Sequence, residues 1–305
     1  MLKVRSFWAL LLFLGLYLFW GFNPGGREMA AVWAENELAV TSSEHPSDHQ
    51  AGLSTTVENE SGEVISILGR EVSPGDEIIT AEGQHYRITQ VENGKAIAED
   101  LGADQAMVSY MDFFASTSIP AMVQAEAQSK TVGIYHTHSD ESYVPTDGTE
   151  SIKFDGGIYQ VGQTLAEDLE GENVQVEYDT TAHDPHDSNA YARSRRTAVQ
   201  LMEKGPVALI DVHRDGIPDA SYYQAQIENQ DVARLRLVVG RENPNMNANL
   251  DFAKQMMAYA NEVHPYVVKE IFLASGNYNQ DLMPTALLVE AGTYTNSREE
   301  AERGI

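Results

Sequence analysis

The second half of the chain alternates two kinds of apolar pattern, and this alternation constrains the fold most. From residue 131 onward, short apolar runs typical of strands are separated by stretches whose apolar residues recur at helical spacing. This order of elements favours an α/β layer fold. The run at 207–212 is almost entirely apolar, as expected for a central strand covered on both faces. The predicted strands are 131–135, 174–178, 207–212, 222–227, 232–239, 270–273 and 286–289, and the predicted helices are 158–169, 190–202, 250–263 and one capped by the stretch 295–297.

The composition limits the chemistry that such a fold could carry. The 305 residues include no cysteine, which excludes disulfide bonds, thiolate zinc sites, iron–sulfur clusters and a cysteine nucleophile. Any metal must therefore be held by histidine and carboxylate side chains. The chain has 46 Asp and Glu residues against 20 Lys and Arg, for a formal net charge of −26. This balance argues against a nucleic-acid partner, because phosphate binding needs concentrated Lys and Arg.

The first residues differ from the rest of the chain. Lys3 and Arg5 precede an uncharged, strongly apolar run at residues 7–22. Because positive residues stand on the N-terminal side of the run, we predict a signal anchor or transmembrane segment at 1–22, with a cytoplasmic N-terminus. The remainder of the chain is then extracytoplasmic, in a single-pass protein of the cell membrane. A stretch of small residues at 30–34 leaves cleavage of the segment open.

Three further parts are predicted between this segment and the α/β region. Residues 23–61 are mostly polar, with little periodicity, and are typical of a flexible linker. Residues 62–112 carry short β-like runs separated by turn signals, including an Asn-Gly pair, which predicts a small antiparallel β module. Residues 113–130 have the character of a connector, and residues 131–305 form the main domain.

The first predicted strand of the main domain leads into a segment rich in histidine. His136 and His138 stand two residues apart on extended chain, a spacing that points both imidazoles to the same side. Glu141 follows, where a turn can bring its carboxylate inward. Two imidazoles and a carboxylate are ligands that zinc takes in proteins, although a pair of structural histidines would give the same pattern.

Two other predicted strands also end in residues capable of chemistry. His213 follows the run at 207–212, and Glu290 follows the run at 286–289. Sites in open α/β sheets form at the carboxyl edge of the strands. A buried carboxylate must be paired, hydrogen-bonded or bound to metal, so Glu290 is a candidate general base or one half of a salt bridge to Arg214. Together the three strand ends predict a mononuclear zinc hydrolase with an open position for water.

The same strand ends resemble a known family. Segment 135–143 (Tyr-His-Thr-His-Ser-Asp-Glu-Ser-Tyr), segment 211–215 (Asp-Val-His-Arg-Asp) and segment 288–296 are similar to motifs of the stage II sporulation protein P family. That family belongs with the zinc-dependent N-acetylmuramoyl-L-alanine amidases. The stretch 190–197 also resembles the family. The resemblance covers residue 131 to the C-terminus and implies an amidase-type α/β fold and a Zn²⁺ cofactor.

The resemblance also implies roles for individual residues. Glu141 and His213 match ligand positions of the family, and the remaining ligand is either His136 or His138. Glu290 matches the catalytic carboxylate. Arg214 is implied either to orient Glu290, to stabilise the tetrahedral oxyanion, or to serve the structure alone.

The implied activity is cleavage of the amide bond between N-acetylmuramic acid and the L-alanine of the peptidoglycan stem peptide. Members of the family are also associated with cleavage of stem-peptide cross-links. They work with a partner lytic transglycosylase while the forespore is engulfed during sporulation. The expected partners are therefore peptidoglycan, this transglycosylase and the membrane.

Two other functions stay open from the sequence. A metal-dependent phosphoesterase also holds metal with two histidines on a first strand, and His183, His186 and His264 could supply ligands to further metals, although each is typical of a loop or surface position. A non-catalytic wall-binding protein is the second alternative. The sequence ends within the first turns of its last predicted helix, where related catalytic domains usually continue, so a truncated C-terminus is a further expectation.

Overall fold

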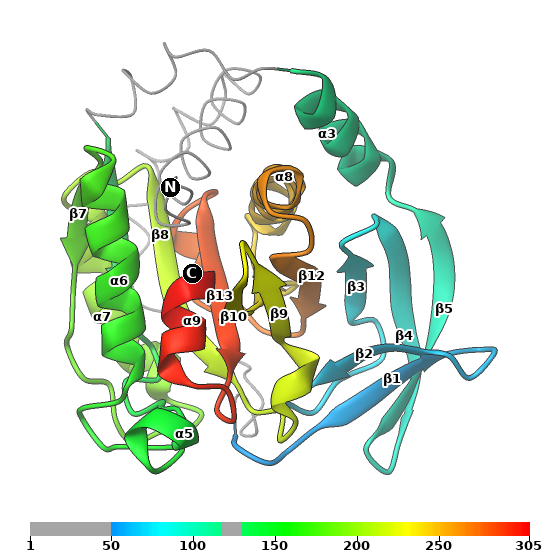
Figure 1. Cartoon of the computed structure of the whole chain (residues 1–305), viewed down its shortest axis with the longest axis horizontal. Helices are drawn as coiled ribbons and strands as arrows, with labels where there is room; N and C mark the ends of the chain where they lie inside the picture. Colours follow the sequence, from blue (N-terminus) through cyan, green and yellow to red (C-terminus); the bar gives the residue numbers. More distant parts are fainter. Residues whose placement is uncertain (1–49, 118–129) are drawn as a thin grey trace.

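One mixed sheet of 11 strands organises the molecule, with helices packed against it (Figure 1). This computed structural model describes residues 50–117 and 130–305. The strands follow one another across the sheet in the order β2-β1-β5-β4-β3-β12-β11-β13-β8-β6-β7, and β9 pairs with β10 separately. The strands are β1 Thr55–Asn59, β2 Val64–Leu68, β3 Glu77–Thr80, β4 Gln84–Glu92, β5 Lys95–Ala103, β6 Thr131–Tyr135, β7 Gln175–Tyr178, β8 Ala208–Asp215, β9 Gln224–Ile227, β10 Gln230–Ala233, β11 Leu235–Gly240, β12 Val268–Ala274 and β13 Ala286–Thr293. The helices are α3 Gln105–Ser116, α5 Val144–Asp147, α6 Ile158–Gly171, α7 Ala190–Met202, α8 Met246–Val263 and α9 Arg298–Gly304, with 3₁₀ turns η3 Ala220–Tyr222 and η4 Gln280–Leu282.

The four strands at one end of the sheet, β13-β8-β6-β7, are parallel to one another, and this determines where their ends meet. β8 pairs in parallel with β13 on one side and with β6 on the other. All eight residues of β8 are buried, which confirms the doubly covered strand predicted at 207–212, although β8 stands third from one edge of the sheet. Because parallel strands end at the same edge of a sheet, the carboxyl ends of β6, β8 and β13 come close together.

Helices cover the two faces of the sheet unequally. The apolar residues of α6, α8 and α9 join one large core cluster with alternate residues of β6, β8, β11 and β13. α7 packs on the opposite face, against β6 and β8. The spacing of apolar residues explains such packing, since α6 buries Ile158, Val161, Leu165 and Leu169 along one side of the helix. The predicted α/β class, with a sheet covered by helices, is confirmed.

Strands β1–β5 extend this sheet and do not form a module of their own. β3 pairs antiparallel with β12, so the predicted separate module at 62–112 continues the main sheet. Val57 of β1 and Ile78 of β3 lie in one buried cluster with Val238 and Phe272 of the main sheet. The hairpin signals are correct for β3, β4 and β5, which pair antiparallel. Local turn signals, however, carry no information about which distant strand an edge strand joins.

Two boundaries also differ from those predicted. β1 lies within the predicted linker at 23–61, because its sequence is mostly polar and Val57 is its single buried apolar residue. Hydrogen bonds to β2 on one side and β5 on the other hold it in the sheet. α3 begins inside the range predicted as β module, where the Asp104 side chain caps the helix by accepting a hydrogen bond from the Met107 N–H.

The range predicted as a single strand at 232–239 is divided. β10 ends at Ala233 and β11 begins at Leu235. β9 and β10 form a hairpin of their own, whose turn residues Glu228 and Asn229 have φ of 52° and 64°. A left-handed turn of this kind suits a two-residue hairpin, because its twist matches that of the flanking strands.

No helix within residues 50–117 and 130–305 is long and apolar enough to cross a membrane. The membrane segment predicted at 1–22 lies outside these residues, as do most of the predicted linker and most of the connector predicted at 113–130. Those assignments stay predictions.

Candidate metal centre

The candidate site begins where β6 ends. The chain turns there, with the Glu141 N–H donating to the carbonyl of His138. Neighbouring segments support the turn, since the Ser142 N–H donates to the carbonyl of Glu150 and the Ile158 N–H donates to the carbonyl of Glu141. Glu141 is fully buried as a result.

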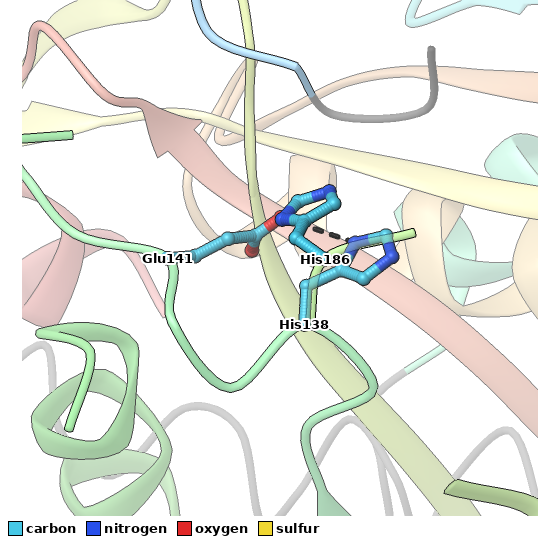
Figure 2. Close-up of side chains that lie close together, drawn as sticks. All are labelled: His138, Glu141 and His186. Carbon is cyan, nitrogen blue, oxygen red and sulfur yellow. Dashed lines mark ion pairs between the residues drawn. The ribbon is translucent and has the colours of Figure 1, made fainter. Parts of the chain in front are cut away.

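Three side chains come together at this turn (Figure 2). His138, Glu141 and His186 each offer a ligand atom, and these atoms lie within 4.8 Å of one another. Nδ1 of His138 is 3.4 Å from Oε1 of Glu141. The His186 ring stacks on the His138 ring, with centroids 3.7 Å apart. In the parts of the chain that the structure describes, no other group of three or more His, Asp or Glu residues has such spacing.

β8 brings a third imidazole to the same carboxylate. Nδ1 of His213 is 3.6 Å from Oε2 of Glu141, and the rings of His213 and His138 have centroids 5.0 Å apart. The strand ends of β6 and β8 therefore meet at Glu141, as the sequence predicts. We refer to His138, Glu141, His186 and His213 as the imidazole cluster.

The other ring nitrogen of His213 faces a second carboxylate. Nε2 of His213 is 2.9 Å from Oδ1 of Asp211, which stands two residues earlier on the same face of β8. Thr137 holds Asp211 in place, since its N–H and its hydroxyl donate to the two carboxylate oxygens at 2.8 and 2.6 Å. Burial lowers the pKa of His213, but Asp211 and Glu141 outweigh burial and raise that pKa to about 10. The two carboxylates thus favour a positive charge on or beside the His213 ring.

His136 has surroundings of its own, outside the imidazole cluster. Its Nδ1 donates to the carbonyl of Val212 at 2.8 Å, and its Nε2 is 2.9 Å from the hydroxyl of Tyr178. Burial lowers the pKa of His136 to about 4. Gly162 leaves room for this ring, because a Cβ there would lie 2.4 Å from Nε2. The period of two that would place His136 and His138 on one side holds only within a strand, and β6 ends before His136.

Glu290 on β13 belongs to a neighbouring buried cluster. It stands opposite His213 in the register of β13 and β8. Its Oε2 accepts hydrogen bonds from Arg236 Nη1 at 2.9 Å and from the Tyr223 hydroxyl at 3.1 Å. Arg236 also contacts two further buried carboxylates. We refer to Asp215, Tyr223, Arg236, Glu270 and Glu290 as the Arg236 cluster.

The Arg236 cluster has more carboxylates than cations. Asp215 accepts a hydrogen bond from the Tyr223 hydroxyl at 2.8 Å, and Glu270 lies 2.7 Å from Arg236. Burial raises the pKa of Asp215 to about 6, with Glu290 adding to the rise and Arg236 opposing it. Three buried carboxylates thus depend on one guanidinium.

Arg214 turns toward Glu141 and not toward Glu290. Its backbone N–H donates to Oε2 of Glu141 at 2.8 Å, and its Nη1 is 3.9 Å from Oε1 of the same residue. Neighbouring residues of a strand point to opposite faces, so Arg214 does not share the face of His213, to which Glu290 is paired. The salt-bridge partner of Glu290 is Arg236, where the sequence suggests Arg214.

The similarity of the chain to known proteins extends beyond these motifs. A profile of the family described as Stage II sporulation protein P matches residues 36–305. The chain belongs to the stage II sporulation protein P family. A protein of Bacillus subtilis (strain 168) named Stage II sporulation protein P is 26% identical to it over 306 residues, which covers 90% of this chain and 75% of that protein. The family match includes β1–β5, which the motifs leave aside.

The sequence assigns no role to Asp211 and Arg236, and it offers His186 only as a ligand for further metals of a phosphoesterase. Asp211 carries a usable signal, because residues two apart on a strand share a face and His213 follows by two. Arg236 carries a weaker one, a charge inside the apolar run of β11. His186 carries none, since its loop has no periodicity that would predict a direction for the side chain.

The imidazole cluster fits the zinc ion that the resemblance to the stage II sporulation protein P family implies. Imidazole nitrogen and carboxylate oxygen are zinc ligands. The ligand atoms of His138, Glu141 and His186 lie within 4.8 Å of one another, and His213 adds a nitrogen 3.6 Å from the second oxygen of Glu141. Asp211 behind His213 matches the carboxylate–histidine arrangement found around histidines that bind metal. The residues that could hold a metal are therefore His138, Glu141, His186 and His213.

Proposed function

We propose that this chain is a zinc-dependent N-acetylmuramoyl-L-alanine amidase. It hydrolyses the amide bond between N-acetylmuramic acid and the L-alanine of the peptidoglycan stem peptide during sporulation. The strongest support is that nitrogens of His138 and His213 lie 3.4 and 3.6 Å from the two oxygens of Glu141, while the buried Glu290 is paired with His213 on the neighbouring strand. Membership of the stage II sporulation protein P family supports the role in sporulation and cell-wall degradation.

In this proposal His138, Glu141 and His213 hold the zinc ion. A zinc ion bound by such ligands lowers the pKa of water and polarises a carbonyl oxygen. Asp211 positions His213, because a carboxylate at Nε2 keeps the ring proton on that nitrogen and leaves Nδ1 to face Glu141. Thr137 supports Asp211 in turn through two hydrogen bonds.

Glu290 acts first as a general base and then as a general acid. It takes a proton from the attacking water while the water oxygen bonds to the lactyl carbonyl carbon, and it passes the proton to the alanine nitrogen as the C–N bond breaks. Arg236 and Tyr223 fix the Oε2 atom of Glu290. Arg214 positions Glu141 through its backbone N–H and its guanidinium, so we assign it a positioning role.

We further propose that residues 1–22 anchor the protein in the cell membrane and that the catalytic part acts outside the cytoplasm. The net charge of −26 offers no electrostatic attraction to anionic wall polymers. Engagement of the wall must then come from contacts at the site or from a partner. The family resemblance suggests a lytic transglycosylase as that partner.

The proposal is tested with the purified full chain and purified peptidoglycan. Mass spectrometry of the soluble products is expected to detect stem peptides with a free L-alanine amino group. A chelator should abolish their release, and added Zn²⁺ should restore it. Glu290→Gln, which keeps the shape of the side chain but cannot take a proton, should slow release about 10²–10⁴-fold. The exposed Glu170→Gln should not change the rate.

Two results would contradict the proposal. Release of stem peptides that a chelator does not affect would exclude the zinc mechanism. Absence of release by the wild type would exclude the enzyme, and an unchanged sporulation phenotype in a Glu290→Gln strain would favour a non-catalytic wall-binding protein.

The number of metals separates the amidase from a metal-dependent phosphoesterase. One zinc ion per chain is expected, and two or three would contradict the amidase. His183 and His264 are engaged elsewhere: His183 donates to the carbonyl of His136 at 2.7 Å and lies 2.8 Å from the hydroxyl of Thr197, and His264 stands at the C-terminal end of α8.

A further inference from the structure

We infer that His186 is a fourth protein ligand at this site, and the one that leaves when substrate enters. The inference rests on the proposed function, because it concerns the same metal. It adds a resting state in which four protein side chains bind the metal. Displacement of His186 then opens a coordination position for substrate.

Three imidazoles gather around the Glu141 carboxylate, which makes four candidate ligands where three would serve catalysis. His138, Glu141 and His186 offer ligand atoms within 4.8 Å of one another, and His213 reaches the other oxygen of Glu141 at 3.6 Å. Zinc sites with four protein ligands are closed and structural, whereas catalytic sites keep three and leave one position open. One of the four side chains must therefore move before substrate can react.

His186 is the least firmly held of the four. Its side chain is 20% exposed, whereas the side chains of His138, Glu141 and His213 are 2%, 0% and 0% exposed. The three buried residues lie on β8 or directly after β6, while His186 lies on the loop between β7 and α7. Movement of His186 consequently disturbs the core least.

His186 also has a second partner within reach. Its Nδ1 is 3.1 Å from Oδ1 of Asp140. The other oxygen of Asp140 accepts a hydrogen bond from the hydroxyl of Ser151 at 2.5 Å, which fixes the carboxylate. Asp140 can therefore accept a hydrogen bond from the His186 imidazole after it leaves the metal, so the displaced ring keeps a hydrogen-bond partner.

The residues before and after His186 are held by hydrogen bonds, which favours movement of its side chain over movement of the loop. The His183 N–H donates to the hydroxyl of Ser139 at 2.9 Å. Arg193 donates to the carbonyl of His183 and to the carboxylate of Asp187, both at 2.6 Å. Rotation of the His186 side chain between its two partners requires no rearrangement of the loop.

The test counts imidazole ligands in the zinc-loaded full chain by X-ray absorption spectroscopy. Three are expected in the wild type and two in both His186→Ala and His186→Phe. The Phe variant keeps a ring to stack on His138, so it separates the lost nitrogen from lost packing. His264→Ala, at the end of α8, should retain three. A soluble muramyl peptide added to Glu290→Gln, which prevents turnover, should lower the count from three to two.

The outcomes separate this inference from the proposed function. A wild-type count of two that both His186 variants share would overturn the inference and leave the zinc site standing. A count of three that the muramyl peptide does not change would overturn the displacement. No zinc binding by the wild type would overturn both. As a second readout, His186→Phe should weaken zinc binding by about tenfold, within the range seen for supporting residues of metal sites.

Discussion

Two buried polar clusters adjoin where His213 of β8 is paired with Glu290 of β13, and they neutralise their carboxylates in different ways. In the imidazole cluster, histidines whose charge changes with protons and metal lie around Glu141, and the guanidinium of Arg214 lies farther off, at 3.9 Å. In the Arg236 cluster, three carboxylates share a guanidinium that stays protonated. The positive charge beside Glu141 can therefore change as protons or a metal ion bind to the histidines, whereas the positive charge of Arg236 is permanent.

One strand face supplies both clusters. Asp211, His213 and Asp215 alternate along β8 and point to the same side. His213 serves the exchangeable cluster, while Asp215 serves the permanent one. In the proposed function, one residue that would bind the replaceable cation and the fixed base thus stand in adjacent positions, His213 on β8 and Glu290 on β13.

Removing the guanidinium of Arg236 should have the largest effect on the free energy of unfolding. Arg236→Met leaves Asp215, Glu270 and Glu290 buried without their shared partner, so we expect a loss of about 3–5 kcal/mol in the free energy of unfolding. Urea denaturation measures this loss. Arg298→Met is the matched control, because the half-buried Arg298 pairs with Asp147 and should cost less than about 1 kcal/mol. Equal effects of the two variants would contradict the contrast between the clusters.

Binding of zinc to the imidazole cluster should have the second-largest effect on the free energy of unfolding. Zinc at about 100 times its dissociation constant is expected to stabilise the wild type by about 2.7 kcal/mol, because it binds the folded chain alone. Thermal unfolding with and without zinc measures this gain. His213→Ala should lose most of it, and a gain that survives in this variant would place the metal elsewhere.

Removing the charge of Asp211, which faces His213, should have a smaller effect, and this effect is on zinc affinity. Asp211→Asn removes the negative charge 2.9 Å from Nε2 of His213, and we expect a 10–100-fold loss of zinc affinity, or about 1.4–2.7 kcal/mol. Titration against a competing chelator checks this, with the exposed Asp231→Asn as control. Unchanged affinity would show that His213 needs no such orientation.

The smallest effect concerns a cluster near the surface. Burial raises the pKa of Glu77, but His85 and Arg87 outweigh it and lower that pKa below its ordinary value. A lowered folded-state pKa gives stability that is present above the unfolded value and is lost as pH falls through the folded value. Glu77→Gln should therefore cost less than about 1 kcal/mol at pH 7 and flatten the decline in stability below about pH 5. Urea denaturation at several pH values measures this change. If the variant and the wild type lose stability equally as pH falls, the pairing of Glu77 with His85 and Arg87 contributes nothing.

Much of the fold could be predicted because apolar periodicity reports burial. α7 coincides with the helix predicted at 190–202, and β8 has the continuous apolar sequence of a doubly covered strand. β1 could not be found this way, because its polar residues face partners that only the sheet provides. The joining of β3 to β12 is a contact between distant segments, and no local pattern encodes it.

The candidate site divides in the same way. His138, Glu141 and His213 follow or end neighbouring parallel strands, so their meeting could be predicted from strand order. The separation of His136 from this group depends on where β6 ends, a boundary that sequence defines only loosely. His186 comes from a loop that carries no periodic signal, and its position depends on contacts through space.

The pairing of β3 with β12 has a consequence for handling the protein. A fragment that begins at Thr131 would leave the edge of β12 with open main-chain N–H and C=O groups, and it would uncover Val238 and Phe272. Open, apolar edge strands recruit strands from other chains. We therefore expect residues 131–305, expressed by themselves, to self-associate into insoluble material, so that β1–β5 protect this part of the chain against aggregation.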